Sequence, residues 1–189
     1  MQKRSHALLA RTLLTQVRGF HKKRFELAFL LGSFQPDCNP LTYLKGSRTG
    51  KPLMGHNFSN SRAYVTSRIL RLQRRDRWSV WQYYTLGKLT HYLADAFTFP
   101  HNDTYTDSLQ EHRRYEAALR RQLSRRLTQL GEMPVSLPRD PAEALDRLHC
   151  RYLTTASDLH RDIDYILEAT SLLMAVLHPE PSGANSCRL

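Results

Sequence analysis

Five side chains of metal-binding types occur within 26 residues in the middle of the chain: His91, Asp95, His101, His112 and Glu116. His91 and Asp95 are four residues apart, and so are His112 and Glu116. Side chains at this spacing lie on one side of a helix, so each pair can point at a single cation. The pattern therefore predicts a metal site that is built mainly from two helices.

The mixture of donor atoms in this set indicates zinc. Imidazole nitrogen combined with carboxylate oxygen suits Zn²⁺, whereas calcium and magnesium prefer oxygen ligands and iron–sulfur clusters need thiolates. The alternative is that the residues form exposed helical pairs without a metal. However, His91 and Asp95 lie in a largely apolar segment, residues 86–97, where unpartnered polar groups would be costly to bury. A metal would supply the missing partner.

The length and charge of the chain restrict the remaining choices. A chain of 189 residues and 22.0 kDa, of which 41% are hydrophobic, buries roughly 70% of its unfolded surface and is expected to form one domain. We place this domain at residues 1–178 and a polar, frayed tail at residues 179–189. The net charge of +11 favours an anionic partner: a nucleic acid, a phosphorylated small molecule or an acidic membrane surface.

Cysteine usage and the N-terminal segment favour a cytoplasmic protein. Cys38, Cys150 and Cys187 are widely spaced and form no CxxC pair, which fits a reduced compartment. The apolar residues among the first 18 are too few and too interrupted for the core of a signal peptide. No segment approaches the roughly 18 apolar residues of a membrane span.

Hydrophobic periodicity predicts helices along most of the chain. They are expected at residues 8–17, 25–31, 61–75, 78–99, 107–130, 140–155 and 158–177, the first two being either separate or one helix broken at Gly19. Gly32 is expected to end the second helix and Pro100 the fourth. Asp140 and Pro141 are typical of a helix start. No alternating strand pattern is present, so the fold class is predicted to be all-α.

Residues 33–59 are predicted to be a long loop with a functional role. They contain three prolines and three glycines and have little periodicity. Structureless connections of this length are uncommon inside compact domains and are often functional. This segment holds two further residues that can bind metal, Asp37 and His56.

The order and spacing of these residues resemble those of the zinc-dependent phospholipase C family and its relatives, the S1/P1-type nucleases. The resemblance covers roughly residues 5–120 and rests on the order His6, Asp37, His56, His91, Asp95, His101, His112, Glu116. It implies a single-domain helical bundle with a multinuclear zinc cleft.

The resemblance also implies a distribution of these ligands among the metal ions. One zinc would be held by His56, His91 and Asp95, and a second by His101, His112 and Glu116, with Asp95 as a bridge. A third would take Asp95, His6, Asp37 and the amine and carbonyl of the first residue, which is usually tryptophan in the family.

This chain departs from that pattern at its first residue. It has Met1 in place of the tryptophan, and no tryptophan follows nearby. Because Gln2 is bulky, Met1 is expected to be retained, and its amine could then bind metal in the same way. Two zinc ions are thus expected, and the third depends on Met1.

Zinc ions close together can bind phosphoryl oxygens, lower the pKa of a water towards about 7 and stabilise the leaving oxygen. We therefore expect a zinc-dependent phosphoric ester hydrolase that cleaves a phospholipid phosphodiester as phospholipase C does. Asp37 would orient or deprotonate the water, or else bind metal. The alternatives are a single-strand nuclease of the S1/P1 type and a non-catalytic zinc module that binds anionic phospholipid or nucleic acid.

Residues outside this set receive simpler interpretations. The arginines of residues 62–77 and 113–126 make two basic helices, which are either solvated faces or a positive rim for phosphate-bearing partners. The aromatic residues Trp78, Trp81, Tyr83 and Tyr84 are expected in the core. The remaining histidines, at positions 21, 149, 160 and 178, are expected to be solvated or at helix ends.

Overall fold

The computed structural model describes residues 1–16, 20–38, 58–102, 108–131, 138–154 and 158–177. In these residues the regular elements are all helical, which confirms the all-α prediction. They are α1 (Lys3–Gln16), α2 (Lys23–Cys38), α3 (Phe58–Gln73), α4 (Val80–Ala96), the 3₁₀ turn η2 (Phe99–His101), α5 (Leu109–Thr128), α6 (Pro141–Leu153) and α7 (Leu159–Leu177). None of the helices in this part of the chain is both long and apolar enough to cross a membrane.

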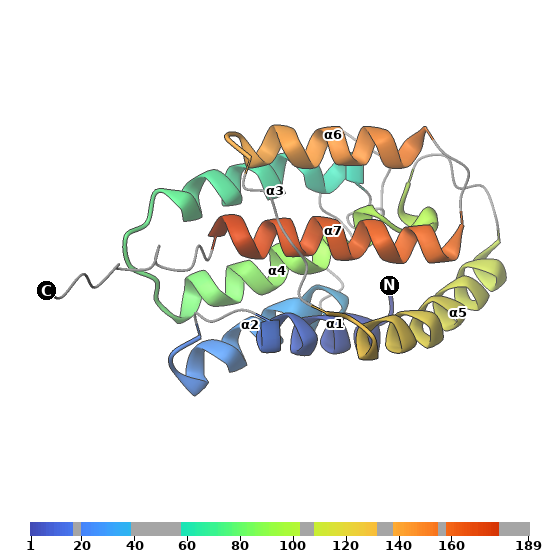
Figure 1. Ribbon diagram of the computed structural model, residues 1–189, viewed down its shortest axis with the longest axis horizontal. Helices are drawn as coiled ribbons and strands as arrows, with labels where there is room; N and C mark the ends of the chain where they lie inside the picture. Colours follow the sequence, from blue (N-terminus) through green and yellow to red (C-terminus); the bar gives the residue numbers. More distant parts are fainter. Residues whose placement is uncertain (17–19, 39–57, 103–107, 132–137, 155–157, 178–189) are drawn as a thin grey trace, which may run out of the picture.

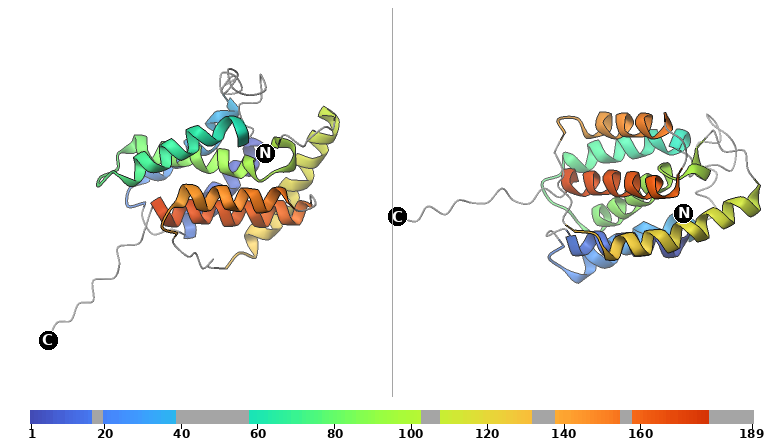
Figure 2. Two further views of the ribbon diagram at one scale, coloured as in Figure 1. Left: turned by 90° about the horizontal axis from the view of Figure 1, so that it is seen from above. Right: turned by 45° about the vertical axis from the view of Figure 1, so that its right-hand side comes forward.

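Helix α4 is the central element of the bundle. In Figures 1 and 2, α1 and α2 lie on one side of it and α3, α6 and α7 on the other, while α5 runs beside α1. From Leu86 onward nearly every residue of α4 is buried, whichever way its side chain points. A helix that is covered all round is a core helix, and its polar side chains must therefore find partners inside the protein.

Two glycines allow α2 and α4 to pack with their backbones almost in contact. A Cβ atom added at Gly32 would lie 2.1 Å from Tyr84 O, and one added at Gly87 would lie 2.1 Å from Phe29 O. No other residue can fit at such a distance without moving a helix backbone. This contact fixes the last two turns of α2 against the second half of α4.

The prediction that Gly32 ends the second helix is therefore wrong. Gly32 is a packing residue, and α2 continues through Pro36 to Cys38. Asp37 consequently lies in the last turn of a helix and not on a loop. A glycine followed by a proline is typical of a helix end, but here the close approach of α4 supplies a different reason for the glycine.

Helix α1 begins at Lys3, five residues earlier than expected, whereas the boundaries of α3 to α7 lie within about three residues of the prediction. Helix α4 ends at Ala96, earlier than predicted, because the Thr98 N–H and hydroxyl both donate to the Asp95 carbonyl, at 3.0 and 2.7 Å. Pro100 falls instead in the first turn of η2. At the start of α6, Asp140 accepts hydrogen bonds from Ala142 N and Glu143 N, which confirms the predicted N-cap.

Two expectations about aromatic residues and histidines are corrected. Tyr83 is buried as predicted, but Trp81 is 72% exposed and does not belong to the core. His149 is buried, its ring stacked on Phe58 at 3.5 Å, and is not solvated. Trp81 is in the first turn of α4, beyond the reach of the neighbouring helices, whereas His149 faces inward between α6 and the turn after α4.

Candidate metal centre

Helix α4 supplies the central pair of the site. His91 and Asp95 are both fully buried, and His91 Nε2 lies 3.2 Å from Asp95 Oδ2, as their spacing predicts. The other ring nitrogen, Nδ1, is 2.9 Å from the carbonyl oxygen of Ser33 on α2. A carbonyl can only accept, so Nδ1 is the donor, and the neutral form of this ring has its lone pair on Nε2, which faces the site. This hydrogen bond sets the tautomer that a metal ligand needs.

Helix α2 adds Asp37 to this pair. Asp37 Oδ1 is 3.6 Å from His91 Nε2. The carboxylate reaches this position because the Gly32–Gly87 contact brings the end of α2 against α4. The close packing of the two helices is thus a structural requirement of the site.

Helix α1, which lies beside α2, adds His6. The His6 ring stacks on His91 with 3.8 Å between centroids, and its Nε2 lies 3.2 Å from Asp95 Oδ1 and 3.9 Å from Asp37 Oδ2. One ligand atom from each of His6, Asp37, His91 and Asp95 lies within 4.8 Å of the other three. Three helices, the consecutive α1 and α2 and the more distant α4, therefore bring together two imidazoles and two carboxylates.

The electrostatics of this cluster suit a bound cation. Burial and the neighbouring His91 lower the pKa of His6 to about 3, so its ring is neutral at physiological pH. Burial alone would raise the pKa of Asp95, but the Met1 ammonium and the surrounding histidines outweigh it and hold that pKa well below its usual range. The site thus presents the neutral imidazole of His6 beside the ionised carboxylate of Asp95, which are the protonation states that zinc requires.

A second group lies next to this cluster. His112 Nε2 on α5 is 3.3 Å from Glu116 Oε1, and the His101 and His112 rings are 5.5 Å apart, edge to face. Thr98 orients His101: its hydroxyl donates its only proton to the Asp95 carbonyl, so at 2.8 Å it accepts from His101 Nδ1. As in His91, the lone pair is then on Nε2.

The turn that carries His101 is held by a network that the sequence interpretation missed. Asn102 donates to the carbonyls of Ala96 and Thr98, at 3.1 and 2.9 Å, and its Oδ1 is 2.9 Å from Nε2 of the buried His149. The Phe99 N–H donates to Asp162 Oδ2 at 3.1 Å. These contacts join α6 and α7 to the turn, and no spacing in the sequence indicates them.

Asp162 also links the turn to α5. Its Oδ2 accepts a hydrogen bond from the hydroxyl of Tyr115, the residue before Glu116. Burial raises the pKa of Asp162, and the proximity of this carboxylate contributes to the raised pKa of Tyr115 after burial itself. His101 and Glu116 are therefore positioned through one shared carboxylate.

The amine of Met1 joins the two groups. It is buried and lies 2.5 Å from Asp95 Oδ1 and 3.6 Å from Glu116 Oε1. Burial lowers the pKa of this amine, but Asp95, Glu116 and Asp37 together outweigh burial and raise it. In this geometry the first residue contacts the carboxylates of both groups.

The structure brings the described residues of the predicted site together in two adjoining groups. The tightest set is His6, Asp37, His91 and Asp95, which combines residues assigned to the first and third zinc ions. His101, His112 and Glu116 form the adjoining group. His56 lies outside the described residues.

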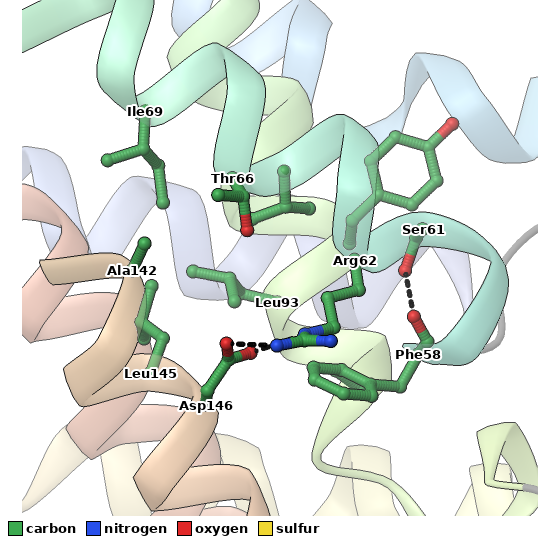
Figure 3. Close-up of a pocket in the computed structure, with 12 residues that line it drawn as sticks. Phe58, Ser61, Arg62, Thr66, Ile69, Leu93, Ala142, Leu145 and Asp146 are labelled. Atoms are coloured by element: carbon green, nitrogen blue, oxygen red, sulfur yellow. Dashed lines mark hydrogen bonds and ion pairs between the residues drawn. The ribbon is translucent and has the colours of Figure 1, made fainter.

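A pocket elsewhere in the bundle shows that ordinary packing differs from this site. Figure 3 shows the space between α3, α4 and α6, lined by apolar side chains such as Ile69, Leu93 and Leu145 and by the ion pair of Arg62 with Asp146. Its volume is about 10 Å³, hardly enough for one water molecule. It contains no group of histidines and carboxylates, so we regard it as a packing defect.

The residues of the centre fit zinc. Both ring nitrogens of His6 are buried and make no well-formed hydrogen bond within the described part of the chain, although buried nitrogens normally have a partner. The donor set of imidazole nitrogens and carboxylate oxygens is that of protein zinc sites. Both His91 and His101 have their second nitrogen engaged by an oxygen atom, as metal-binding histidines do.

Comparison with known families agrees with this geometry. Searches of curated proteins and of solved structures found no match. Residues 5–168, which include the described residues of the centre apart from Met1, match the family described as zinc dependent phospholipase C. The match covers most of the chain and all seven α-helices in whole or in part. The chain therefore belongs to the zinc-dependent phospholipase C family.

Proposed function

We propose that this protein is a zinc-dependent phosphodiesterase that cleaves phospholipids in the manner of phospholipase C, releasing the phosphorylated headgroup from the glycerol. The observation that carries the proposal is the buried cluster of His6, Asp37, His91 and Asp95 in a chain that belongs to this family. Family membership suggests the reaction class, and the cluster supplies the residues for it.

We assign zinc ligands from the two groups of the centre. Asp95 is the proposed shared ligand, because its Oδ1 lies 3.2 Å from His6 Nε2 and its Oδ2 lies 3.2 Å from His91 Nε2. His101, His112 and Glu116 are proposed to hold a further ion. His56, assigned from the order of ligands in the family, is proposed to complete the set.

Zinc, when bound, polarises phosphoryl oxygens and makes water a better nucleophile near neutral pH. The chain itself holds the proposed zinc ligands rigidly. Each described ligand lies on a helix except His101, which lies in the η2 turn, and hydrogen bonds join this turn to α6 and α7. Burial excludes bulk water from the ligands and strengthens their electrostatic effect on the phosphate. Asp37, at the end of α2, is the residue proposed to accept the proton of the attacking water.

Asp37 also has a second proposed role, as a ligand. Its oxygens lie 3.6 Å from His91 Nε2 and 3.9 Å from His6 Nε2, close enough for the three side chains to share one ion. The two roles predict different zinc contents after the same substitution, so measurement of bound metal separates them.

The proposal is tested by metal content and turnover together. Purified protein, supplemented with zinc and then dialysed, should retain at least two zinc ions per chain by elemental analysis. It should hydrolyse a short-chain, monomeric phosphatidylcholine. Single-stranded DNA and a chromogenic phosphodiester are assayed in parallel.

Asp164→Asn is the matched control, because Asp164 is an exposed carboxylate on α7 that pairs with Arg126 at the surface. It should behave as the wild type. Less than one zinc per chain in the wild type would refute the metal centre. Full zinc occupancy without turnover of any substrate would favour the non-catalytic module, and turnover of DNA alone would favour the nuclease.

The role of Met1 has its own test. Two residues added before Met1 move the terminal amine away from Asp95 and Glu116, which it contacts at 2.5 and 3.6 Å. If the amine is a ligand, the extended protein should bind fewer zinc ions than the protein whose intact mass shows an unmodified Met1. Equal zinc content in both would exclude the amine as a ligand.

A further inference from the structure

A groove between α1 and α5 concentrates positive charge on the outside of the molecule. It has a volume of about 690 Å³ and is lined by Arg4, Ala7, Leu8, Arg11, Arg120, Arg121, Ser124 and Arg125. Of the eight described residues that line it, five are arginines and none is acidic. The guanidinium group stays charged at any physiological pH, so the groove is permanently cationic.

Within the described residues, none of these five arginines forms an ion pair with a carboxylate. The arginines that do so lie elsewhere: Arg62 with Asp146, Arg126 with Asp164, Arg147 with Glu143 and Arg151 with Glu168. Arg4 and Arg11 lie on the exposed face of α1, opposite the buried Leu9 and Leu13. The groove therefore presents its charge to an external anion.

The groove differs from the positive rim that the sequence suggested. The arginines of α3 and α5 do not form one surface, because the two helices lie on opposite sides of the bundle in Figures 1 and 2. Helix α5 instead runs beside α1, where Gln16 Nε2 donates to Gly131 O just beyond the end of α5. The basic surface is thus formed by two helices that also carry residues of the metal centre.

The position of the groove relates it to that centre. On α1, Met1 and His6 belong to the centre, while Arg4, Leu8 and Arg11 face outward. On α5, Arg120 follows Glu116 by one helical turn, about 6 Å along the axis, and Arg125 is about 14 Å from it. An anion in the groove would therefore lie beside the metal centre without occupying it.

We propose that this groove docks the protein onto the phosphate groups of an anionic phospholipid bilayer. Arginine binds phosphate oxygens with paired, charge-assisted hydrogen bonds, and basic clusters attract anionic membranes. Leu8 and Ala7 give the groove an apolar strip that can contact the glycerol region. Naming a lipid as the partner rests on the proposed phospholipase function, which would benefit from a surface that holds the bilayer beside the centre.

The composition of the groove favours lipid over a single-stranded nucleic acid. Binding sites for single strands combine basic residues with aromatic side chains on which the bases stack. Among the lining residues that the structure describes, none is aromatic. Phosphate recognition without a stacking platform fits a headgroup better than a base.

The experiment compares two variants that lose the same charge. The groove variant carries Arg4→Gln, Arg11→Gln, Arg121→Gln and Arg125→Gln, all at exposed positions. The control variant carries Arg71→Gln, Arg74→Gln, Arg75→Gln and Arg77→Gln, which are exposed positions on and after α3. Co-sedimentation measures binding to vesicles of phosphatidylcholine alone and of phosphatidylcholine with phosphatidylglycerol, at low and high salt.

The wild type should bind the anionic vesicles preferentially, and high salt should weaken that binding. The groove variant should bind them about 600-fold more weakly at low salt, since it lacks four basic residues and each one near such a surface contributes roughly a factor of five. The control variant should stay within about threefold of the wild type. Equal losses in both variants would overturn the proposal, because net charge alone would then explain binding. Tighter, groove-dependent binding of single-stranded DNA would overturn it in favour of nucleic acid.

Two further measurements separate this proposal from the proposed function. The groove variant should keep its zinc content, melting temperature and rate on monomeric short-chain phosphatidylcholine. If the wild type binds anionic vesicles through the groove but hydrolyses nothing, the docking surface stands and the enzymatic proposal fails. If the quadruple variant unfolds, the pair Arg4→Gln and Arg121→Gln is tested in its place, and unchanged vesicle binding by that pair would refute the docking surface.

Discussion

Substitution of Gly87 by alanine should disturb the metal centre through the packing of α2 against α4. A Cβ at this position would lie 2.1 Å from Phe29 O, 2.8 Å from Ser33 N and 3.0 Å from Gly32 C, all of them backbone atoms. The shortest favourable carbon–oxygen contacts are about 3.3 Å, so the two helices must separate locally by roughly 1 Å. No side chain can move aside to avoid this.

The size of the effect follows from two opposing contributions. Overpacking of a core typically costs about 1–3 kcal/mol, whereas alanine is favoured over glycine within a helix by about 1 kcal/mol. Because the obstructing atoms are backbone, we expect overpacking to dominate, with a net loss of about 1–2 kcal/mol. For a chain of this size the melting temperature should fall by roughly 2–8 °C.

The same displacement should weaken zinc binding. It moves Ser33 O, which fixes the His91 tautomer at 2.9 Å, and Asp37, which lies 3.6 Å from His91 Nε2. Metal–ligand distances tolerate only about 0.2 Å, and loss of a supporting hydrogen bond to a ligand typically costs about 10- to 100-fold in metal affinity. Zinc affinity is measured by competition with a chelator, and stability by thermal denaturation followed by circular dichroism.

Gly131→Ala is the matched control, since a Cβ at that position would meet no atom within 4 Å. It should leave both stability and zinc affinity near those of the wild type. A Gly87→Ala protein with unchanged melting temperature and unchanged zinc affinity would refute the reasoning. The contact between α2 and α4 would then not be what positions the ligands.

Three further substitutions test individual residues. Asp95→Asn should lower zinc content and turnover more than His6→Ala, because the fully buried Asp95 faces His6, His91 and the Met1 amine; equal metal loss by elemental analysis would contradict a shared ligand. If Asp37 is the general base, Asp37→Asn should reduce phosphodiester turnover by about 10²- to 10⁴-fold while most zinc is retained. Loss of one zinc ion would instead identify Asp37 as a ligand, and unchanged turnover would exclude both roles. Burial lowers the pKa of His149 to about 4 from an ordinary 6.5, so the folded protein favours the neutral ring. The contribution of this neutral ring to the free energy of unfolding is fully present above pH 6.5. That contribution, roughly 3 kcal/mol, should be lost as the pH falls towards 4. Urea denaturation of zinc-free protein should show a flatter pH dependence in His149→Gln, and an identical dependence in both proteins would mean that His149 does not titrate in this way.

The sequence by itself determined the helical class and the best-defined part of the site. Apolar residues at helical spacing predicted the helices, since that periodicity is a local property of the chain. The spacing of His91 with Asp95 and of His112 with Glu116 predicted that each pair would share a helix face, and the Nε2-to-carboxylate distances of 3.2 and 3.3 Å agree with it. The order of these residues also indicated the family, which the comparison confirmed.

The tertiary structure decided which residues meet across helices. Sequence placed Asp37 on a loop, because a glycine and a proline nearby are typical of a helix end, but Gly32 serves the contact with α4 and the helix continues. The grouping of His6 with His91, and the support that Ser33, His149 and Asp162 give to the centre, join residues about 50 or more positions apart. Such contacts depend on how helices pack, and close packing is set by the shapes of both partners, which the local pattern of either segment does not contain.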